Sequence, residues 1–406
     1  KTAEKILDNN SDKSYLLTSL DARHFKLINE RFGHIVGDQT LMNIAKNIKS
    51  KFHKNGLYAR SQGDSFLILV EDTSQNRELL KSLVDLDISI HNTTNYKVPL
   101  KIGVCPIPRY NPALSLSLYI DRANIAKKYT SARNTNYICY FTDDMNKKLN
   151  MKNMIESEMV RALSKGEFVV YYQPKYEIAN DTIIGAEALV RWNHKEKGII
   201  SPGVFIPVFE RNGFIVDLDF YVYEQVLKMQ KHRLDMGKKV IPISMNVSRC
   251  HLSDTNFVDK LEAVVAKYKV PKQYIEMEIT ESIFSQEDSS AIALIYNLKE
   301  HGFTISMDDF GSGYSSLNLL RKVPIDTLKI DKVFIDSTED VQRSQVIVEE
   351  IINMASKIHV KTICEGVETQ SQRDFLKIAG CNMVQGYFYS KPLPYEDFSD
   401  LLNSSK

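Results

Sequence analysis

Short apolar runs alternate with longer amphipathic stretches along the chain. In the first third, the runs "SYLLTSLDA" (14–22) and "VPLKIGVCPI" (98–107) have the composition of strands. Helical spacing of apolar residues covers 37–52 and about 116–130, and a polar turn between two apolar runs predicts a β-hairpin over 57–71. Strands and helices are interleaved, so this pattern predicts a mixed α/β domain over residues 1–142.

The pattern changes after residue 142. Residues 143–165 read as one polar-to-amphipathic helix, which we interpret as a connector. Short runs rich in Ile and Val then alternate with helical stretches such as "FVDKLEAVVAKYK" (257–269) and "SQVIVEEIINMASKI" (344–358). Serial strand–helix units over about 240 residues predict a parallel barrel of the TIM type over residues 166–406.

Composition narrows the possible functions. The formal net charge is +1, which gives no electrostatic footprint for nucleic acid. No apolar run reaches the roughly 18 residues of a membrane span. The five cysteines show no paired spacing, so we expect a reduced, cytoplasmic compartment and no zinc site. The first residue is Lys, and we expect a fragment whose missing N-terminal region could anchor the full-length protein at the inner face of a membrane.

Polar side chains recur where the strands of the second domain end. Because the C-terminal ends of barrel strands meet at one mouth, these side chains are expected to lie together. They include the acids Glu187, Glu278, Glu281, Asp308, Asp309, Asp331, Glu365 and Glu368, the amides Asn246 and Gln385, and the cations Arg191 and Lys329.

One acid after a strand is usually the N-cap of the next helix, and one buried Lys near acids is usually a structural ion pair. The same coincidence on many strands favours another interpretation, because crowded carboxylates repel one another unless a cation compensates. Oxygen ligands without a His or Cys cluster favour Mg²⁺ or Mn²⁺. The residues alone therefore predict a metal-dependent phosphoryl hydrolase.

These residues lie in blocks that occur in order along residues 154–400. The blocks are "YYQP" (171–174), "EALVRW" (187–192), "NVS" (246–248), "EITES" (278–282), "DDFGSGYSSL" (308–317), "LKID" (328–331), "EGVET" (365–369) and "QGY" (385–387). Together they resemble the EAL domain, the phosphodiesterase of the bacterial second messenger cyclic di-GMP. The resemblance implies hydrolysis of cyclic di-GMP to linear pGpG, two bound Mg²⁺ or Mn²⁺ ions, and a homodimer formed through this domain.

The resemblance also assigns roles to residues. It makes Glu187, Asn246, Glu278 and Asp308 ligands of the first metal, and Asp308, Asp309 and Glu365 ligands of the second. Glu365 would be the general base, with Lys329 as the polar partner of the attacking water. Gln173, Arg191, Glu368 and Gln385 would hold substrate, and Glu281 would anchor the loop after Asp309. Lys175, Met307 and Asn318 differ from the family pattern at positions where we expect side chains to be exchangeable.

The first domain resembles the GGDEF domain, the diguanylate cyclase that makes cyclic di-GMP from two GTP, and this implies a nucleotidyl-cyclase-like α/β fold. The resemblance rests on "DARHFKLINERFGHIVGD" (21–38), the hairpin with "QGDSF" (62–66), and "IGV" (102–104). It makes Asp21 and Asp64 metal ligands and Asn29 and Asp38 the pair that reads guanine. Lys26, and less directly Lys128 and Arg133, would contact phosphate.

Several positions of this domain depart from the family. Gln62 replaces a glycine where the backbone approaches the triphosphate, Ser65 replaces an acid, and Arg23 stands at a usual Asp. We therefore expect no cyclase activity, and Asp64 is either a turn residue or part of a retained GTP site that regulates the second domain. The competing hypotheses for the whole chain are a non-catalytic cyclic di-GMP receptor that signals to a partner and a bifunctional enzyme. Its near-neutral charge argues against a nucleic-acid-binding protein.

Overall fold

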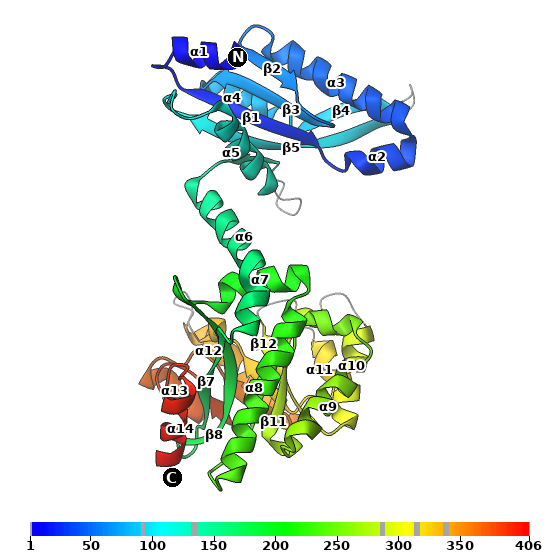
Figure 1. Ribbon diagram of the computed structural model, residues 1–406. Helices are drawn as coiled ribbons and strands as arrows, with labels where there is room; N and C mark the ends of the chain where they lie inside the picture. The colour runs from blue at the N-terminus through cyan, green and yellow to red at the C-terminus, as the bar shows by residue number, and fades with distance from the viewer. Residues whose placement is uncertain are drawn as a thin grey trace. The chain divides into compact units, whose positions relative to one another are not determined.

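The computed structural model describes residues 2–90, 94–130, 137–284, 289–311, 317–335 and 341–405. The chain divides into two compact units, Lys1–Asn153 and Met154–Lys406 (Figure 1). Helix α6 (Asp143–Ser164) contains the junction between them. Among the described helices, none has both the length and the apolar character that a membrane span requires.

The first unit is built on a six-stranded, largely antiparallel sheet with the order β2-β3-β1-β5-β4, and β6 pairs with β5. The strands are β1 (Tyr15–Ala22), β2 (Gly56–Arg60), β3 (Ser65–Glu71), β4 (Asp85–Ile90), β5 (Thr94–Ile107) and β6 (Ile138–Tyr140). The helices are α1 (Thr2–Asn9), α2 (Phe25–Phe32), α3 (His34–Phe52), α4 (Ser74–Lys81) and α5 (Leu116–Lys128). This arrangement confirms the mixed α/β fold.

Helix α5 lies directly against strand β5, and the glycine at position 103 makes this close contact possible. A Cβ atom at Gly103 would lie 2.0 Å from the carbonyl oxygen of Ala123 and 2.3 Å from the backbone nitrogen of Lys127. Because real Cβ contacts are never that short, only glycine fits in the "IGV" block. The close packing brings the end of α5 over β1.

The second unit is a closed barrel (Figure 1). Its sheet runs β10-β11-β12-β13-β14-β15-β7-β8-β9 and closes where β10 also pairs with β8. The strands are β7 (Phe168–Glu177), β8 (Thr182–His194), β9 (Gly198–Ile200), β10 (Ile243–Asn246), β11 (Ile275–Thr280), β12 (Thr304–Phe310), β13 (Thr327–Ile330), β14 (Lys361–Cys364) and β15 (Met383–Val384). The barrel fold is as expected from the serial strand–helix units.

Helices and short 3₁₀ turns connect the barrel strands. The helices are α7 (Pro202–Asn212), α8 (Ile215–Asp235), α9 (Phe257–Tyr268), α10 (Ser289–Glu300), α11 (Leu317–Lys322), α12 (Val341–Lys357), α13 (Gln370–Ile378) and α14 (Tyr395–Ser404). The 3₁₀ turns are Arg249–Ser253, Lys272–Tyr274, Glu281–Phe284 and Lys332–Phe334. Apolar faces of these helices pack on the outside of the barrel in one continuous core, as in the contacts of Leu261, Leu298 and Ile352.

Within the closed ring β7, β8 and β10–β15, one strand departs from the all-parallel barrel that the sequence predicts, and outside the ring β9 is antiparallel to β8. Strand β7 is antiparallel to both of its neighbours, β8 and β15. The reason is local, because only residues 178–181 separate β7 from β8, and a parallel crossover needs a dozen or more residues. The polar side chains of β7 therefore enter the barrel from a strand that runs in the opposite direction.

Candidate active site

A buried lysine lies at the centre of the acidic cluster inside the barrel. The side chain of Lys329, on β13, is 1% exposed. Its Nζ lies 2.6 Å from Glu365 Oε1, 2.9 Å from Asp308 Oδ1, 3.2 Å from Glu278 Oε1 and 3.5 Å from Glu187 Oε2. The structure thus brings together acids from β8, β11, β12 and the end of β14 around one ammonium group.

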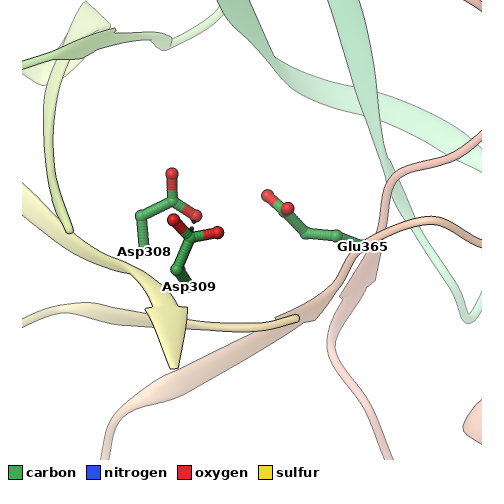
Figure 2. Close-up of side chains that lie close together, drawn as sticks. All are labelled: Asp308, Asp309 and Glu365. Atoms are coloured by element: carbon green, nitrogen blue, oxygen red, sulfur yellow. Dashed lines mark hydrogen bonds between the residues drawn. The ribbon is translucent and has the colours of Figure 1, made fainter. Parts of the chain in front are cut away.

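Three carboxylates of this cluster could hold a metal ion. Asp308, Asp309 and Glu365 each offer an oxygen atom, and these atoms lie within 4.8 Å of one another. Figure 2 shows the two aspartates side by side with Glu365 extending toward them from a separate segment. Glu365 follows directly after β14, as expected for a residue at the mouth of the barrel.

The backbone explains how two consecutive aspartates reach the same place. Side chains of successive residues in a regular strand point to opposite faces. Here the pairing of β12 with β13 shifts register between Met307 and Phe310, and Asp309 adopts a left-handed conformation with φ 55°. This bulge turns the Asp309 side chain toward the cluster, and Asp is among the residues that tolerate positive φ best.

The protonation behaviour of the acids reflects their crowding. Burial, assisted by the neighbouring Asp308 carboxylate, raises the pKa of Asp309 to about 6. Burial also raises the pKa of Glu365 to about 8, with Asp308 and Glu187 acting in the same direction against Lys329. Burial alone would raise the pKa of Glu278, but the charges of Lys175 and Lys329 outweigh this effect and lower the pKa to about 2.

The Gln385 side chain binds Glu187, and the Gln173 side chain binds Gln385. Gln385 Nε2 donates to Glu187 Oε2 at 2.7 Å and to Gln173 Oε1 at 3.1 Å. Gly386 allows this arrangement, because a Cβ there would lie 2.2 Å from the carbonyl oxygen of Val367. Gln173 and Gln385, predicted to hold substrate, are thus buried beside a predicted metal ligand.

Asn246 is positioned by residues that the sequence did not indicate. The Tyr223 hydroxyl, on α8, donates to the Asn246 carbonyl oxygen at 2.9 Å. Asp219, one turn earlier, accepts from the Ser248 backbone nitrogen at 3.3 Å and contacts His251 Nε2 at 2.9 Å. The Asn246 side chain is directed toward Glu187, with Nδ2 3.4 Å from Glu187 Oε1.

The remaining predicted residues lie around the mouth. Arg191 is half-buried with its Cζ 5.7 Å from the centre of the Tyr171 ring, and burial lowers the pKa of its guanidinium group. Glu368 is exposed, and its backbone nitrogen donates to the Gln372 side chain at the start of α13. Glu281 accepts a 2.9 Å hydrogen bond from the Gly311 backbone nitrogen, while residues 312–316 of the loop that it is predicted to anchor lie outside the described part of the chain.

The structure limits exchange at two of the three positions that depart from the family. Lys175 is buried and bonded to Glu276 and Glu278, so an uncharged side chain there would leave two buried acids without this partner. Met307 is 1% exposed in the barrel core, so exchange there is restricted to apolar side chains of similar volume. The side chain of Asn318 lies outside the described residues. The N-cap alternative holds for Asp331, whose side chain accepts from the Val333 nitrogen at 2.7 Å and caps a short turn.

In the first unit, the two predicted metal ligands lie near one lysine. Lys127 Nζ lies 2.7 Å from Asp21 Oδ1, 2.9 Å from Ser19 Oγ and 3.5 Å from Ser65 Oγ. Burial raises the pKa of Asp64, and the Asp21 charge acts in the same direction. The GGDEF resemblance assigns phosphate contact to the adjacent Lys128, which is exposed, and to Arg133, which lies outside the described residues.

The predicted guanine-reading and phosphate residues differ in exposure. The Asn29 amide oxygen is buried and has no hydrogen-bond partner within the described residues. Asp38 is exposed on α3. Lys26 is exposed and forms a 3.6 Å ion pair with Glu30 one turn along α2. Of these three residues, Asn29 alone has a buried polar atom without a hydrogen bond within the described residues, and this atom lies against Gly37 on α3.

Comparison with known proteins identifies both units. Residues 156–392 match the family model of the EAL domain, and residues 1–135 match that of the diguanylate cyclase GGDEF domain. The bifunctional diguanylate cyclase/cyclic di-GMP phosphodiesterase MucR of Pseudomonas aeruginosa is 29% identical, over 95% of this chain and 56% of that protein. The cyclic di-GMP phosphodiesterase NbdA of the same species is 31% identical, over 97% of this chain and 50% of that protein.

A solved structure shares the fold of the barrel unit. The phosphodiesterase PaMucR, in complex with c-di-GMP, is 33% identical with a TM-score of 0.58, over 60% of this chain and 99% of that one. The present chain spans about half the length of the curated relatives described above. Both families named from sequence blocks are confirmed.

Loss of the Lys329 charge is expected to destabilise the barrel strongly. Replacing Lys329 with Met leaves several buried carboxylates without a counter-charge, so we expect the free energy of unfolding to fall by about 3–5 kcal/mol. Urea unfolding followed by the fluorescence of the single tryptophan, Trp192 in the barrel unit, measures this. Lys322→Met, at an exposed position, should change stability by less than about 0.5 kcal/mol. Equal midpoints for the two variants would contradict the expectation.

Proposed function

This chain belongs to the EAL domain family, with a GGDEF domain ahead of the barrel, and we propose that it hydrolyses cyclic di-GMP to linear pGpG. The observation that carries the proposal is the set of oxygen atoms from Asp308, Asp309 and Glu365, within 4.8 Å of one another and next to Lys329. In the proposed organisation, residues 1–142 regulate, residues 143–165 connect and residues 166–406 catalyse. A homodimer through the barrel is part of the proposal.

We propose that the site holds two divalent cations. Glu187, Asn246, Glu278 and Asp308 would hold one ion, and Asp308, Asp309 and Glu365 the other. The donor set is oxygen-rich, as Mg²⁺ and Mn²⁺ prefer. Glu278 Oε2 is fully buried and has no hydrogen-bond partner within the described residues, and a cation would satisfy it. When bound, such ions lower the pKa of water and offset the charge of the phosphodiester.

The side chains of the chain supply binding and proton transfer. Arg191, whose guanidinium group lies beside the Tyr171 ring, would pair with a phosphate oxygen. Gln173 and Gln385 fix the wall beside Glu187, and Glu368 at the rim contacts substrate. The carboxylate oxygen of Glu365 that does not face Lys329 accepts a proton from the attacking water. The water oxygen bonds to phosphorus, the bond from phosphorus to the 3′ oxygen breaks, that oxygen takes up a proton from solvent, and Glu365 returns the accepted proton to solvent.

Turnover tests the proposed reaction directly. The chain, incubated with cyclic di-GMP and Mn²⁺ or Mg²⁺, should give pGpG on chromatography, and chelation with EDTA should stop the reaction. Glu365→Gln should lower kcat by about 10²-fold or more because it removes the proton acceptor. Glu349→Gln, an exposed acid on α12, is the matched control and should leave kcat unchanged.

A different outcome would favour the second hypothesis. Tight binding of cyclic di-GMP without turnover under either metal would make the chain a receptor that signals to a partner. Formation of cyclic di-GMP from GTP would contradict the proposed loss of cyclase activity and make the protein bifunctional.

The GGDEF domain is proposed to bind GTP and to regulate the barrel rather than to synthesise cyclic di-GMP. The support is Asn29, whose buried amide oxygen can accept a hydrogen bond from a guanine base. Asp21, Asp38 and Asp64 would complete the site with Lys26. Gln62 and Ser65 at the hairpin argue against catalysis there.

Calorimetry with GTP and Mg²⁺ tests this regulatory site. We expect heat of binding, a change in the hydrolysis rate when GTP is added, and at least a tenfold weaker affinity in Asn29→Ala. Asn43→Ala on α3 is a matched control that should bind normally. If GTP gives no heat and leaves the hydrolysis rate unchanged, the hairpin is a structural turn and the regulatory proposal is wrong.

A further inference from the structure

A second buried lysine lies inside the barrel beside the proposed metal ligands. Lys175, on β7, is 2% exposed, and its Nζ lies 2.9 Å from Glu278 Oε1 and 3.2 Å from Glu276 Oε1. Glu276 and Glu278 are two residues apart on β11 and therefore point to the same, inner face. Ser306 on β12 completes the group with a hydrogen bond to Glu276.

The antiparallel direction of β7 makes this placement possible. Lys175 pairs with Gly185 on β8. Two residues earlier on the same strand, Gln173 pairs with Glu187. One strand thus contributes Gln173 beside Glu187 and Lys175 beside Glu278.

The two oxygens of Glu278 have different surroundings. Oε1 faces both lysines, at 2.9 Å from Lys175 Nζ and 3.2 Å from Lys329 Nζ. Oε2 is buried and has no hydrogen-bond partner within the described residues. An unsatisfied buried oxygen costs free energy, so its retention indicates a ligand that the protein itself does not supply.

We infer that Lys175 is a positioning residue for the proposed metal centre, because it holds Glu278 by Oε1 and leaves Oε2 for a divalent cation. This inference rests on the proposed function of the barrel. Lys329 is not a substitute, since its ammonium group is shared among four carboxylates, whereas Lys175 contacts only Glu276 and Glu278 among the acids of the cluster. The alternative is that Lys175 only neutralises Glu276 as a structural ion pair.

A pair of variants separates the two roles. Lys175→Met keeps most of the length of the side chain and removes its charge, but it also leaves the buried Glu276 carboxylate without a counter-charge. The double variant Lys175→Met/Glu276→Gln removes that unpaired charge while leaving Glu278 without its anchor. Lys238→Met, at an exposed position, is the matched control for the loss of one lysine.

The readout is Mn²⁺ binding, measured by isothermal titration calorimetry on the whole chain, with urea unfolding as the check on folding. We expect at least tenfold weaker Mn²⁺ binding in Lys175→Met and in the double variant, with the stability of the double variant close to that of the unmodified chain. Hydrolysis by both variants should recover when Mn²⁺ is raised, because the missing residue acts on ion binding rather than on the reacting phosphate.

Other outcomes of the Mn²⁺ titration would overturn the inference. If the double variant binds Mn²⁺ as tightly as the unmodified chain, Lys175 is a structural partner of Glu276 and the inference is overturned. The double variant also decides the question if Lys175→Met alone does not fold. If the unmodified chain binds no Mn²⁺, the proposed metal centre is wrong, and the inference about Lys175 is wrong with it. If the unmodified chain and both variants all bind Mn²⁺ tightly, only the inference about Lys175 is wrong.

Discussion

The pairing of the buried Lys329 ammonium group with carboxylates from four parts of the barrel is the interaction on which the site depends. Moving these charges out of water costs several kcal/mol for each ion, and only short contacts to opposite charges compensate. The contacts, 2.6–3.5 Å long, require β8, β11, β12, β13 and β14 to keep their register. The closed barrel satisfies this requirement, since each strand is fixed by neighbours on both sides.

Two irregularities of the barrel determine where the polar side chains of its interior lie. The register shift in β12 and the positive φ of Asp309 place consecutive acids in one cluster, which a regular strand would separate. The reversed strand β7 pairs Gln173 with Glu187 on the neighbouring strand β8, and it brings Lys175 to Glu276 and Glu278 on β11, which does not pair with β7. The result is an interior in which lysines and amides bind the acids, while Glu278 Oε2 has no hydrogen-bond partner within the described residues and stays available for a cation.

The sequence predicted the fold and the grouping of the acids correctly where ordered blocks of residues match a family or a regular strand–helix alternation. The barrel, the mixed α/β domain and most of the acids around Lys329 followed from strand ends and ordered motifs. The direction of β7 did not, because a hydrophobic run has the same pattern in either direction, and only the short turn at 178–181 indicates a hairpin. Lys175 and Lys127 were missed for a related reason, since their importance comes from partners about 100 residues away along the chain. Met307 and Asp331 show that a motif position can serve the core or a helix cap.

The central claim is that the acids around Lys329 form a centre for two divalent cations. The most direct measurement is anomalous X-ray diffraction at the manganese edge from crystals grown with Mn²⁺ and cyclic di-GMP. Two anomalous peaks are predicted, one bounded by Glu187, Asn246, Glu278 and Asp308 and the other by Asp308, Asp309 and Glu365. Density for cyclic di-GMP in the mouth of the barrel with no anomalous peak among these residues would contradict the account.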